Sequence, residues 1–283
     1  MTNLRESGTM IPGTRSWAGD LFAAIQSGDG YRRTLVLTVA SLLIAFFVWQ
    51  FLSTFVFNPF LIPPPLEVIS TAIPMIVSGE ILADVSISMS RVLVGFLVGS
   101  FVGVVAGVLL GRIRLLHDLL DPIIELLRFL SPTAMIPIAV IWFGIGELSK
   151  YFLIFWGTLF IVLISTIAGV WRAPIARQRA AECLGANRFQ IFVLIVIPSS
   201  VPYIVTGMRV AMASSFMSII PAEILAADSG IGYLLQKSSM LLQTNRIFVA
   251  LLTICILGFV VDRIFRFFVD RILSRYMSFV SLA

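Results

Sequence analysis

The side chains that most often carry out catalysis are scarce in this sequence. It contains one histidine, His117, and two widely separated cysteines, Cys183 and Cys255. No G-x-x-x-x-G-K-S/T phosphate loop occurs, and no group of His, Cys, Asp and Glu has the spacing of a metal site. With one histidine, a Ser–His–Asp triad is not credible either. We therefore expect a chain that is not an enzyme and binds no metal, so that any transport it supports takes its energy from a partner or an ion gradient.

The stretch that points most strongly to a binding role is 177–202, a polar interruption between two apolar segments. It is rich in small and basic residues and ends with a pair of prolines. Such a segment cannot lie in hydrocarbon, so we expect it at the cytoplasmic face, in contact with another protein. Ala180 and Ala181 would let a short helix enter a groove on that protein. Gly185 permits a tight exit, since glycine takes positive φ without strain.

Three arginines, Arg91, Arg128 and Arg209, fall within apolar segments. Charged side chains inside a membrane are costly, and they usually have a function or a partner. A cationic pathway would suit an anionic solute. Each arginine could instead reach an interface or form a structural pair, which we favour, and the acids considered as partners are Asp84, Glu125 and Asp121.

A second pathway signal is the pair of prolines, Pro132 and Pro137, inside the third apolar segment. Each removes a backbone donor and kinks a helix, and a membrane tolerates such irregularity only where it faces protein or a wet cavity. We therefore expect this segment to line a pathway. The complete set of pathway candidates is Pro132, Met135, Pro137, Arg128, Arg209, Met212, Ser215 and Glu223.

The composition indicates which elements hold these residues. Hydrophobic residues make up 59% of the 283 residues and charged residues 12%, with a mean hydropathy of +1.02. A soluble domain has about twice that charged fraction. Several apolar runs exceed 18 residues, long enough to cross a hydrocarbon layer of about 30 Å as helices. We expect an all-α polytopic membrane protein with no cleavable signal, and we take the net charge of +5 as a membrane feature, not a sign of nucleic-acid binding.

The apolar runs predict six spans, at 35–57, 85–110, 122–143, 151–170, 203–220 and 247–265. We expect 66–81 to be an interfacial segment on the outer face. Residues 191–197 are too short to cross, so we expect them to lie along the inner surface, with Pro198 turning the chain into the next span. Fourteen basic residues fall on one side of this topology and three on the other, which places both termini in the cytoplasm.

The second span carries a glycine at every fourth position from 95 to 111. On a helix these glycines form one stripe without side chains, which lets another helix approach closely. We expect tight packing within the chain, and a seam between two copies is the alternative.

The 177–202 stretch resembles the cytoplasmic motif E-A-A-x(3)-G-x(9)-I-x-L-P of the permeases of type-1 ATP-binding-cassette (ABC) importers. The alanine pair, the glycine and the final proline match in spacing, whereas Arg179 stands where the motif has glutamate. The resemblance implies that this stretch docks a cytoplasmic ATPase. The residues that it assigns to docking are Arg179, Ala180, Ala181, Glu182, Leu184, Gly185, Ala186, Asn187, Ile195 and Pro198.

Segments 132–137, 142–147, 222–223 and 229–234 resemble those of permeases for nitrate, taurine, alkanesulfonates and bicarbonate. The likeness extends over about 58–268. It implies the six-span type-1 permease fold, a bacterial-type plasma (inner) membrane location and import of a small anionic solute. The alternatives are a permease for an aromatic acid or a vitamin precursor and, from another class, an ion-coupled secondary transporter.

The resemblance also implies partners and domain limits. The expected partners are ABC ATPases that bind ATP and Mg, a solute-binding protein outside, membrane lipid and a second permease copy in a homodimer. This chain itself would hold no cofactor. Glu223 would shape the outer mouth, touch the binding protein or serve structurally. The predicted parts are a cytoplasmic tail at 1–33, a first span and interfacial segment at 34–83, a core at 84–268 and a cytoplasmic tail at 269–283.

Overall fold

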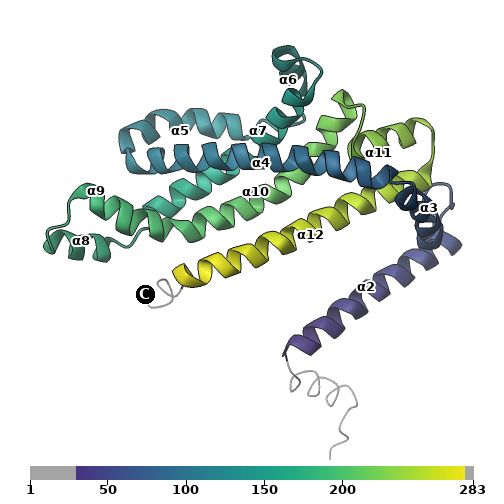
Figure 1. Ribbon diagram of the computed structural model, residues 1–283, viewed down its shortest axis with the longest axis horizontal. Helices are drawn as coiled ribbons and strands as arrows, with labels where there is room; N and C mark the ends of the chain where they lie inside the picture. The colour runs from purple at the N-terminus through teal and green to yellow at the C-terminus, as the bar shows by residue number, and fades with distance from the viewer. Residues whose placement is uncertain (1–29, 278–283) are drawn as a thin grey trace, which may run out of the picture. The chain divides into compact units, whose positions relative to one another are not determined.

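A computed structural model describes residues 30–277, and every regular element in that range is a helix (Figure 1). The all-α prediction is therefore confirmed. Most of the predicted tail at 1–33 and the last six residues of the tail at 269–283 lie outside the described range. The chain forms two compact units, one ending at Pro65 and the other beginning at Leu66.

The first unit contains α2 (Gly30–Phe55), whose apolar part, Leu37–Phe55, is long enough to cross a membrane. A turn follows the helix, and the Phe60 amide donates to Asn58 Oδ1 over 2.9 Å. The Ser53 hydroxyl donates to the Ile62 carbonyl and so joins the helix to the far side of this turn.

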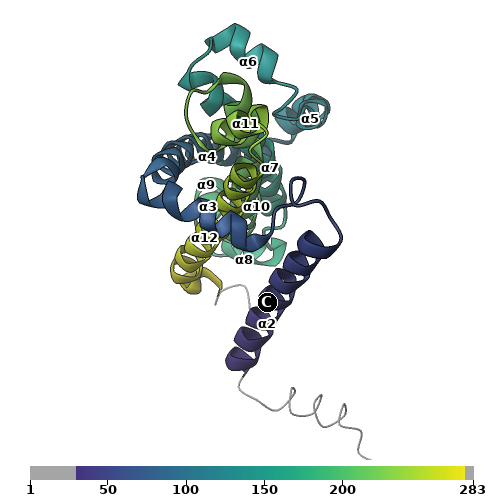
Figure 2. The same ribbon diagram turned by 90° about the vertical axis from the view of Figure 1, so that its right-hand side faces the viewer.

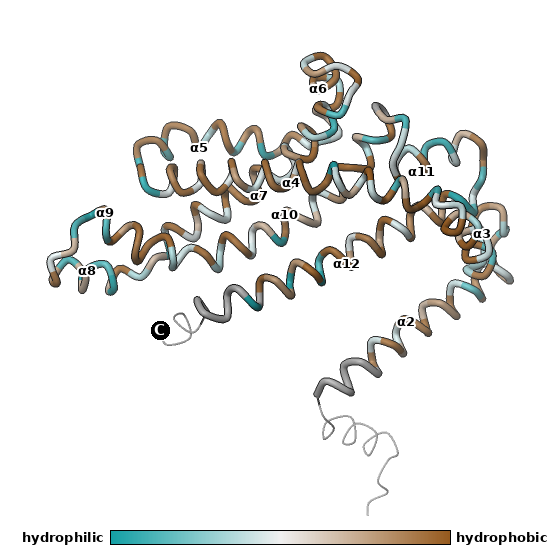
Figure 3. The backbone as a smooth tube through the Cα atoms, in the orientation of Figure 1, coloured by the Kyte–Doolittle hydropathy of each residue, from teal (hydrophilic) through white to brown (hydrophobic). Residues whose placement is uncertain are grey.

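The remaining helices form the second unit, apart from the first residue of α3. In chain order they are α3 (Pro65–Val77), α4 (Glu80–Arg112), α5 (Arg114–Arg128), α6 (Ile136–Phe143), α7 (Glu147–Trp171), α8 (Ile175–Cys183), α9 (Arg188–Ile191), the π-helical turn η1 (Phe192–Val196), α10 (Ile197–Ala226), α11 (Ile231–Met240) and α12 (Thr244–Met277). Figure 2 shows the unit end-on, with α4, α7, α10 and α12 gathered into one bundle. Hydrophobic residues cover most of α4 and α7, whereas α8 is largely hydrophilic (Figure 3).

The centre of the bundle is the contact between α4 and α7, and the glycine stripe makes it possible. A Cβ atom added at Gly95 would lie 2.6 Å from Ile154 Cβ, and one at Gly107 would lie 2.6 Å from Thr166 Cβ. Real Cβ atoms do not approach that closely, so only glycine fits at these positions. The expected packing of the stripe within the chain is confirmed.

The predicted third span at 122–143 is wrong as a single helix. The structure has two helices, α5 and α6, separated by a turn over residues 129–135. Pro132 lies in this turn and Pro137 in the first turn of α6, where a missing backbone donor is tolerated. Figure 1 shows α6 turned away from the direction of α5.

The expected surface-lying segment at 191–197 is also wrong. The chain is helical without interruption from α9 through η1 into α10, and this run supplies one candidate span, Arg188–Ile224. Pro198 does not turn the chain, because it occupies the first turn after the π-helical turn, where the ladder is already irregular. The helix likewise continues past Pro221, beyond the predicted end at 220.

Five described helical runs are long and apolar enough to span a membrane, and they belong to α2, α4, α7, α9–α10 and α12. The predicted total of six spans is therefore not confirmed. The side on which the termini lie stays a prediction.

Candidate functional site

The 177–202 stretch begins with a rigid, exposed hairpin formed by α8, its exit turn and α9. At the end of α8, Gly185 has φ +83° and its amide donates to the Glu182 carbonyl over 3.0 Å. The Ala186 amide donates to the Ala181 carbonyl, also over 3.0 Å. Together these bonds form a Schellman motif, the turn that glycine at this position favours. The expected glycine exit is confirmed.

A capping box starts the next helix directly after that turn. Asn187 Oδ1 accepts from the Gln190 amide over 2.8 Å, and Gln190 Oε1 accepts from the Asn187 amide over 2.9 Å. Both ends of the connection are therefore fixed by backbone geometry and reciprocal hydrogen bonds.

The hairpin exposes large apolar side chains on a polar background. Leu184 is 88% exposed and Phe189 is 74% exposed. No residue of α8 is buried. Apolar side chains held at the tip of a rigid polar hairpin form a surface suited to docking another protein. Ile195 and Pro198, which were expected to belong to the same surface, are half-buried in η1 and α10 instead.

The base of the hairpin is anchored to the bundle by aromatic and basic side chains. Trp171 Nε1 donates to the Gly111 carbonyl over 3.2 Å, which joins the end of α7 to the end of α4. The Arg172 guanidinium lies 5.4 Å from the Tyr203 ring centroid, over α10. A displacement of the hairpin would therefore act on α4, α7 and α10 together.

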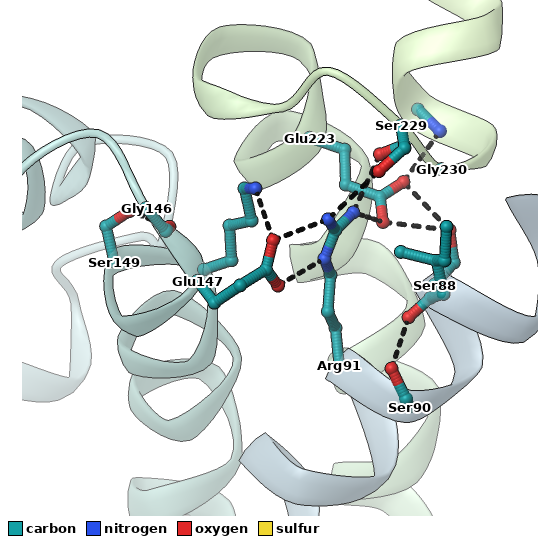
Figure 4. Close-up of polar contacts among 12 residues, drawn as sticks. Ser88, Ser90, Arg91, Gly146, Glu147, Ser149, Glu223, Ser229 and Gly230 are labelled. Carbon is teal, nitrogen blue, oxygen red and sulfur yellow. Dashed lines mark hydrogen bonds and ion pairs between the residues drawn. The ribbon is translucent and has the colours of Figure 1, made fainter.

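At the opposite end of the bundle, near the start of α7 and the end of α10, lies a buried ionic cluster around Arg91 (Figure 4). Arg91 is 2% exposed, and its Nε and Nη2 donate to the two carboxylate oxygens of Glu147, each over 2.7 Å. Its Nη1 donates over 2.7 Å both to Glu223 Oε1 and to the Ser229 carbonyl. One guanidinium thus joins α4, α7, α10 and the loop before α11.

The Glu223 carboxylate, fully buried, completes the cluster from α10. It accepts from Ser88 Oγ over 2.8 Å and from the Gly232 amide over 2.8 Å. The neighbouring Gly230 amide donates to Asp84 Oδ1 over 2.9 Å. The first amides of α11 are therefore held by acceptors from α4 and α10, in place of a local cap.

The acids considered as partners of Arg91 did not include its actual ones, Glu147 and Glu223. These lie 56 and 132 positions from it in the sequence. These ion pairs form only in the packed fold, and no local spacing in the sequence predicts them. The burial of Glu223 favours the structural role that the sequence left open for this residue.

A second ionic group lies between α10 and α12 and is far more exposed. Arg209 Nε donates to Asp262 Oδ1 over 2.9 Å, and Arg266 Nη2 donates to Asp262 Oδ2 over 2.9 Å. Arg209 retains 46% of its side-chain exposure. It opens onto a groove of about 300 Å³, which Met212 also lines. Two of the predicted pathway residues are thus brought together.

The other pathway candidates do not line this groove. Met135 is buried against Leu153 and Ala222, and Ser215 is buried in a 2.9 Å hydrogen bond with Thr158. Arg128 lies 3.5 Å from Glu125, one of the partners considered for it, beside a separate cavity of about 370 Å³. Their assignment to a pathway stays a prediction.

The geometry described so far is that of a helical chain with several helices long and apolar enough to span a membrane and with an exposed hairpin at α8 and α9. Residues 99–274 match the family model described as binding-protein-dependent transport system inner membrane component. The chain is 35% identical over 216 residues to a putative aliphatic sulfonates transport permease of Escherichia coli, covering 76% of this chain and 82% of that protein. It is 30% identical over 236 residues to the taurine transport system permease of the same organism, covering 81% and 86%.

A solved structure supports the fold independently. The MetNI methionine ABC transporter in inward-facing conformations matches with a TM-score of 0.51 and 17% identity, over 63% of this chain and 91% of that chain. The chain belongs to the family of binding-protein-dependent transport system inner membrane components. It is a multi-pass plasma-membrane permease subunit of an ABC importer.

Proposed function

We propose that this permease imports a small anionic solute, with ATP hydrolysed by cytoplasmic ABC ATPases docked on the α8–α9 hairpin. The solute class is supported by the names of relatives that carry taurine and aliphatic sulfonates. In this proposal the chain binds no cofactor, and ATP and Mg are held by the ATPases. A binding protein delivers the solute outside, and a second permease copy completes the pathway.

The observation that carries the docking proposal is the hairpin itself. Its turn is fixed by a Schellman motif and a capping box, and its tip presents Leu184 almost free of contacts. The hairpin connects to α7 and α10, the helices packed at the centre of the bundle. A push on it would be transmitted as a rigid-body motion, because its own turn cannot deform cheaply.

The docking role is tested by co-expressing the full chain with its ATPase and measuring co-purification. Leu184→Asp should weaken the complex at least about tenfold, since loss of a buried apolar anchor costs about 1.4 kcal/mol or more. Gly185→Val should do the same by forcing a β-branched residue to positive φ. Gly79→Val is the matched control, because Gly79 has φ +80° and equally open surroundings but precedes α4.

Normal co-purification of Leu184→Asp, with ATP-driven uptake unchanged, would contradict the docking assignment. Solute uptake by the purified chain alone, driven by an ion gradient, would contradict the ABC mechanism as a whole and favour a secondary transporter.

A further inference from the structure

The turn between α11 and α12 has an unusual backbone. Among residues 30–277, Leu242 is the only residue other than glycine with a positive φ, +54°. The Gln243 amide donates to the Ser238 carbonyl over 2.9 Å, and the Leu242 amide donates to the Ser239 carbonyl over 3.1 Å. These two bonds form a Schellman motif, and Leu242 occupies the position in it where glycine is usual.

The Leu242 side chain gains little from the rest of the chain. It is 69% exposed, so packing does not offset the strain of a positive φ. The equivalent turn of the α8–α9 hairpin has Gly185 at this position. Strained residues gather at functional sites, so the leucine needs an explanation outside the chain.

Leu242 belongs to a run of three apolar residues at the end of α11. Met240 and Leu241 precede it, and both are exposed. These three residues are here called the α11–α12 tip.

The α11–α12 tip lies where a membrane-spanning helix begins. The apolar part of α12, Thr244–Val269, has 26 residues and is therefore about 39 Å long. A bilayer is about 30 Å thick in its hydrocarbon and about 40–45 Å with its head groups. Because the tip directly precedes this helix, it lies at the level of the head groups. The α8–α9 hairpin lies at the other end of the bundle (Figure 1).

Basic and aromatic side chains flank the tip. Lys237 lies one turn before it and is exposed, with Nζ 6.0 Å from the Tyr233 ring centroid. Arg246 lies one turn after it, and its Nη1 is 3.5 Å from Glu80 Oε1, long for a hydrogen bond. Lysine and arginine at the end of a span extend to lipid phosphates, and tyrosine is enriched at the same depth.

We propose that the α11–α12 tip inserts into the lipid leaflet at this end of the bundle, with Lys237 and Arg246 at the level of the phosphates. The tip consists of methionine and leucine, whereas tryptophan, tyrosine and arginine dominate the energy of protein contacts, which favours lipid. Insertion would anchor α11, whose first amides are held by α4 and α10. This inference does not depend on the proposed solute or on ATPase docking.

The test uses the full chain with Cys183→Ser and Cys255→Ser and one new cysteine that carries a bimane label. Met240→Cys places the label on the tip. Leu184→Cys is the matched control, because it labels an exposed apolar residue of the other hairpin. Each labelled chain is placed in phosphatidylcholine nanodiscs, with or without lipid brominated on its acyl chains near the head group, and iodide serves as the quencher in water.

Brominated lipid should lower the fluorescence of the tip label at least about twofold and leave the hairpin label unchanged. Iodide should do the reverse. Leu242→Gly should melt at or above the temperature of the parent, because glycine takes the positive φ without strain. The same change should weaken lipid quenching of the tip label, whereas Leu242→Met, which keeps an apolar side chain, should preserve it.

A tip label that iodide quenches and brominated lipid does not would overturn the inference and favour a soluble protein partner. A tip label that neither quencher reaches would overturn it in favour of a second copy of the chain. Equal lipid quenching of both labels would also contradict it, because the tip would then not differ from the hairpin. If Leu242→Gly melted lower and kept its lipid quenching, the leucine would serve the fold and not the membrane.

Discussion

Arg91 and Arg209 are both arginines of membrane helices, yet their surroundings differ in every respect that matters. Arg91 is 2% exposed and donates to two carboxylates and a carbonyl from three separate parts of the chain. Arg209 is 46% exposed, and its ion pair is with Asp262 of the neighbouring helix, beside a groove. Arg91 holds several parts of the chain together, whereas Arg209 borders an accessible groove.

This difference shows how a membrane arginine can be interpreted. A guanidinium whose donors are all taken has none left to offer a ligand, and moving Arg91 would leave the buried Glu223 carboxylate without its cation, whereas the half-exposed Glu147 would keep Lys150. A half-exposed guanidinium can exchange or add an acceptor at small cost, because solvent or solute compensates. Burial and the number of elements joined, more than depth in the membrane, separate the two roles.

The largest expected effect on stability comes from removing the Arg91 guanidinium from the buried ionic cluster. Arg91→Met should destabilise the protein by about 3–5 kcal/mol, because Glu223 would remain buried without a cation. Thermal unfolding in detergent, followed by circular dichroism, measures the loss. Arg91→Lys should recover only part of it, since an ammonium cannot bond Glu147 and Glu223 in the same fork geometry.

The matched comparison is Arg209→Met in the same assay. A change for Arg209→Met as large as that for Arg91→Met would show that both arginines are structural, and the contrast drawn between them would fail.

A smaller but still clear effect is expected at the α4–α7 contact. Gly107→Ala should destabilise by about 1–3 kcal/mol, because the new Cβ would overlap Thr166 Cβ and the helices would have to separate. Loss of the monodisperse peak in size-exclusion chromatography on heating reports the change. An unaltered melting temperature would mean that α4 and α7 are not packed as described.

The membrane class, most of the spans, the glycine contact and the α8 turn followed from the sequence because each depends on local composition or spacing. Five positions at intervals of four define a helix face, and a glycine after an alanine-rich helix defines an exit. These patterns can be recognised in the sequence without knowledge of the fold.

The errors occurred at prolines, in both directions: Pro198 and Pro221 were taken to interrupt a helix that continues, and Pro132 was taken to lie within one helix that in fact ends before it. Pro198, Pro202 and Pro221 all lie within or at the start of one long helical run, and a π-helical turn directly precedes Pro198. Pro132 did break a helix. Sequence alone cannot separate these cases. The outcome depends on which group donates to the carbonyl that proline leaves without a backbone donor.

Replacing Arg209 should have a small effect on stability. Arg209→Gln should change the free energy of unfolding by less than about 1 kcal/mol, since a half-exposed ion pair contributes little. A stability loss above about 2 kcal/mol would instead place Arg209 in the same structural class as Arg91.

The smallest effect is expected at Gly258, and it is the sharpest contrast with the α4 stripe. Gly258→Ala adds a Cβ atom with 3.9 Å to its nearest neighbour, so no helix has to move. Alanine also favours a helix over glycine by about 0.5–1 kcal/mol, so the variant should melt at or slightly above the wild-type temperature. A destabilised Gly258→Ala would show that this glycine serves a helix contact after all.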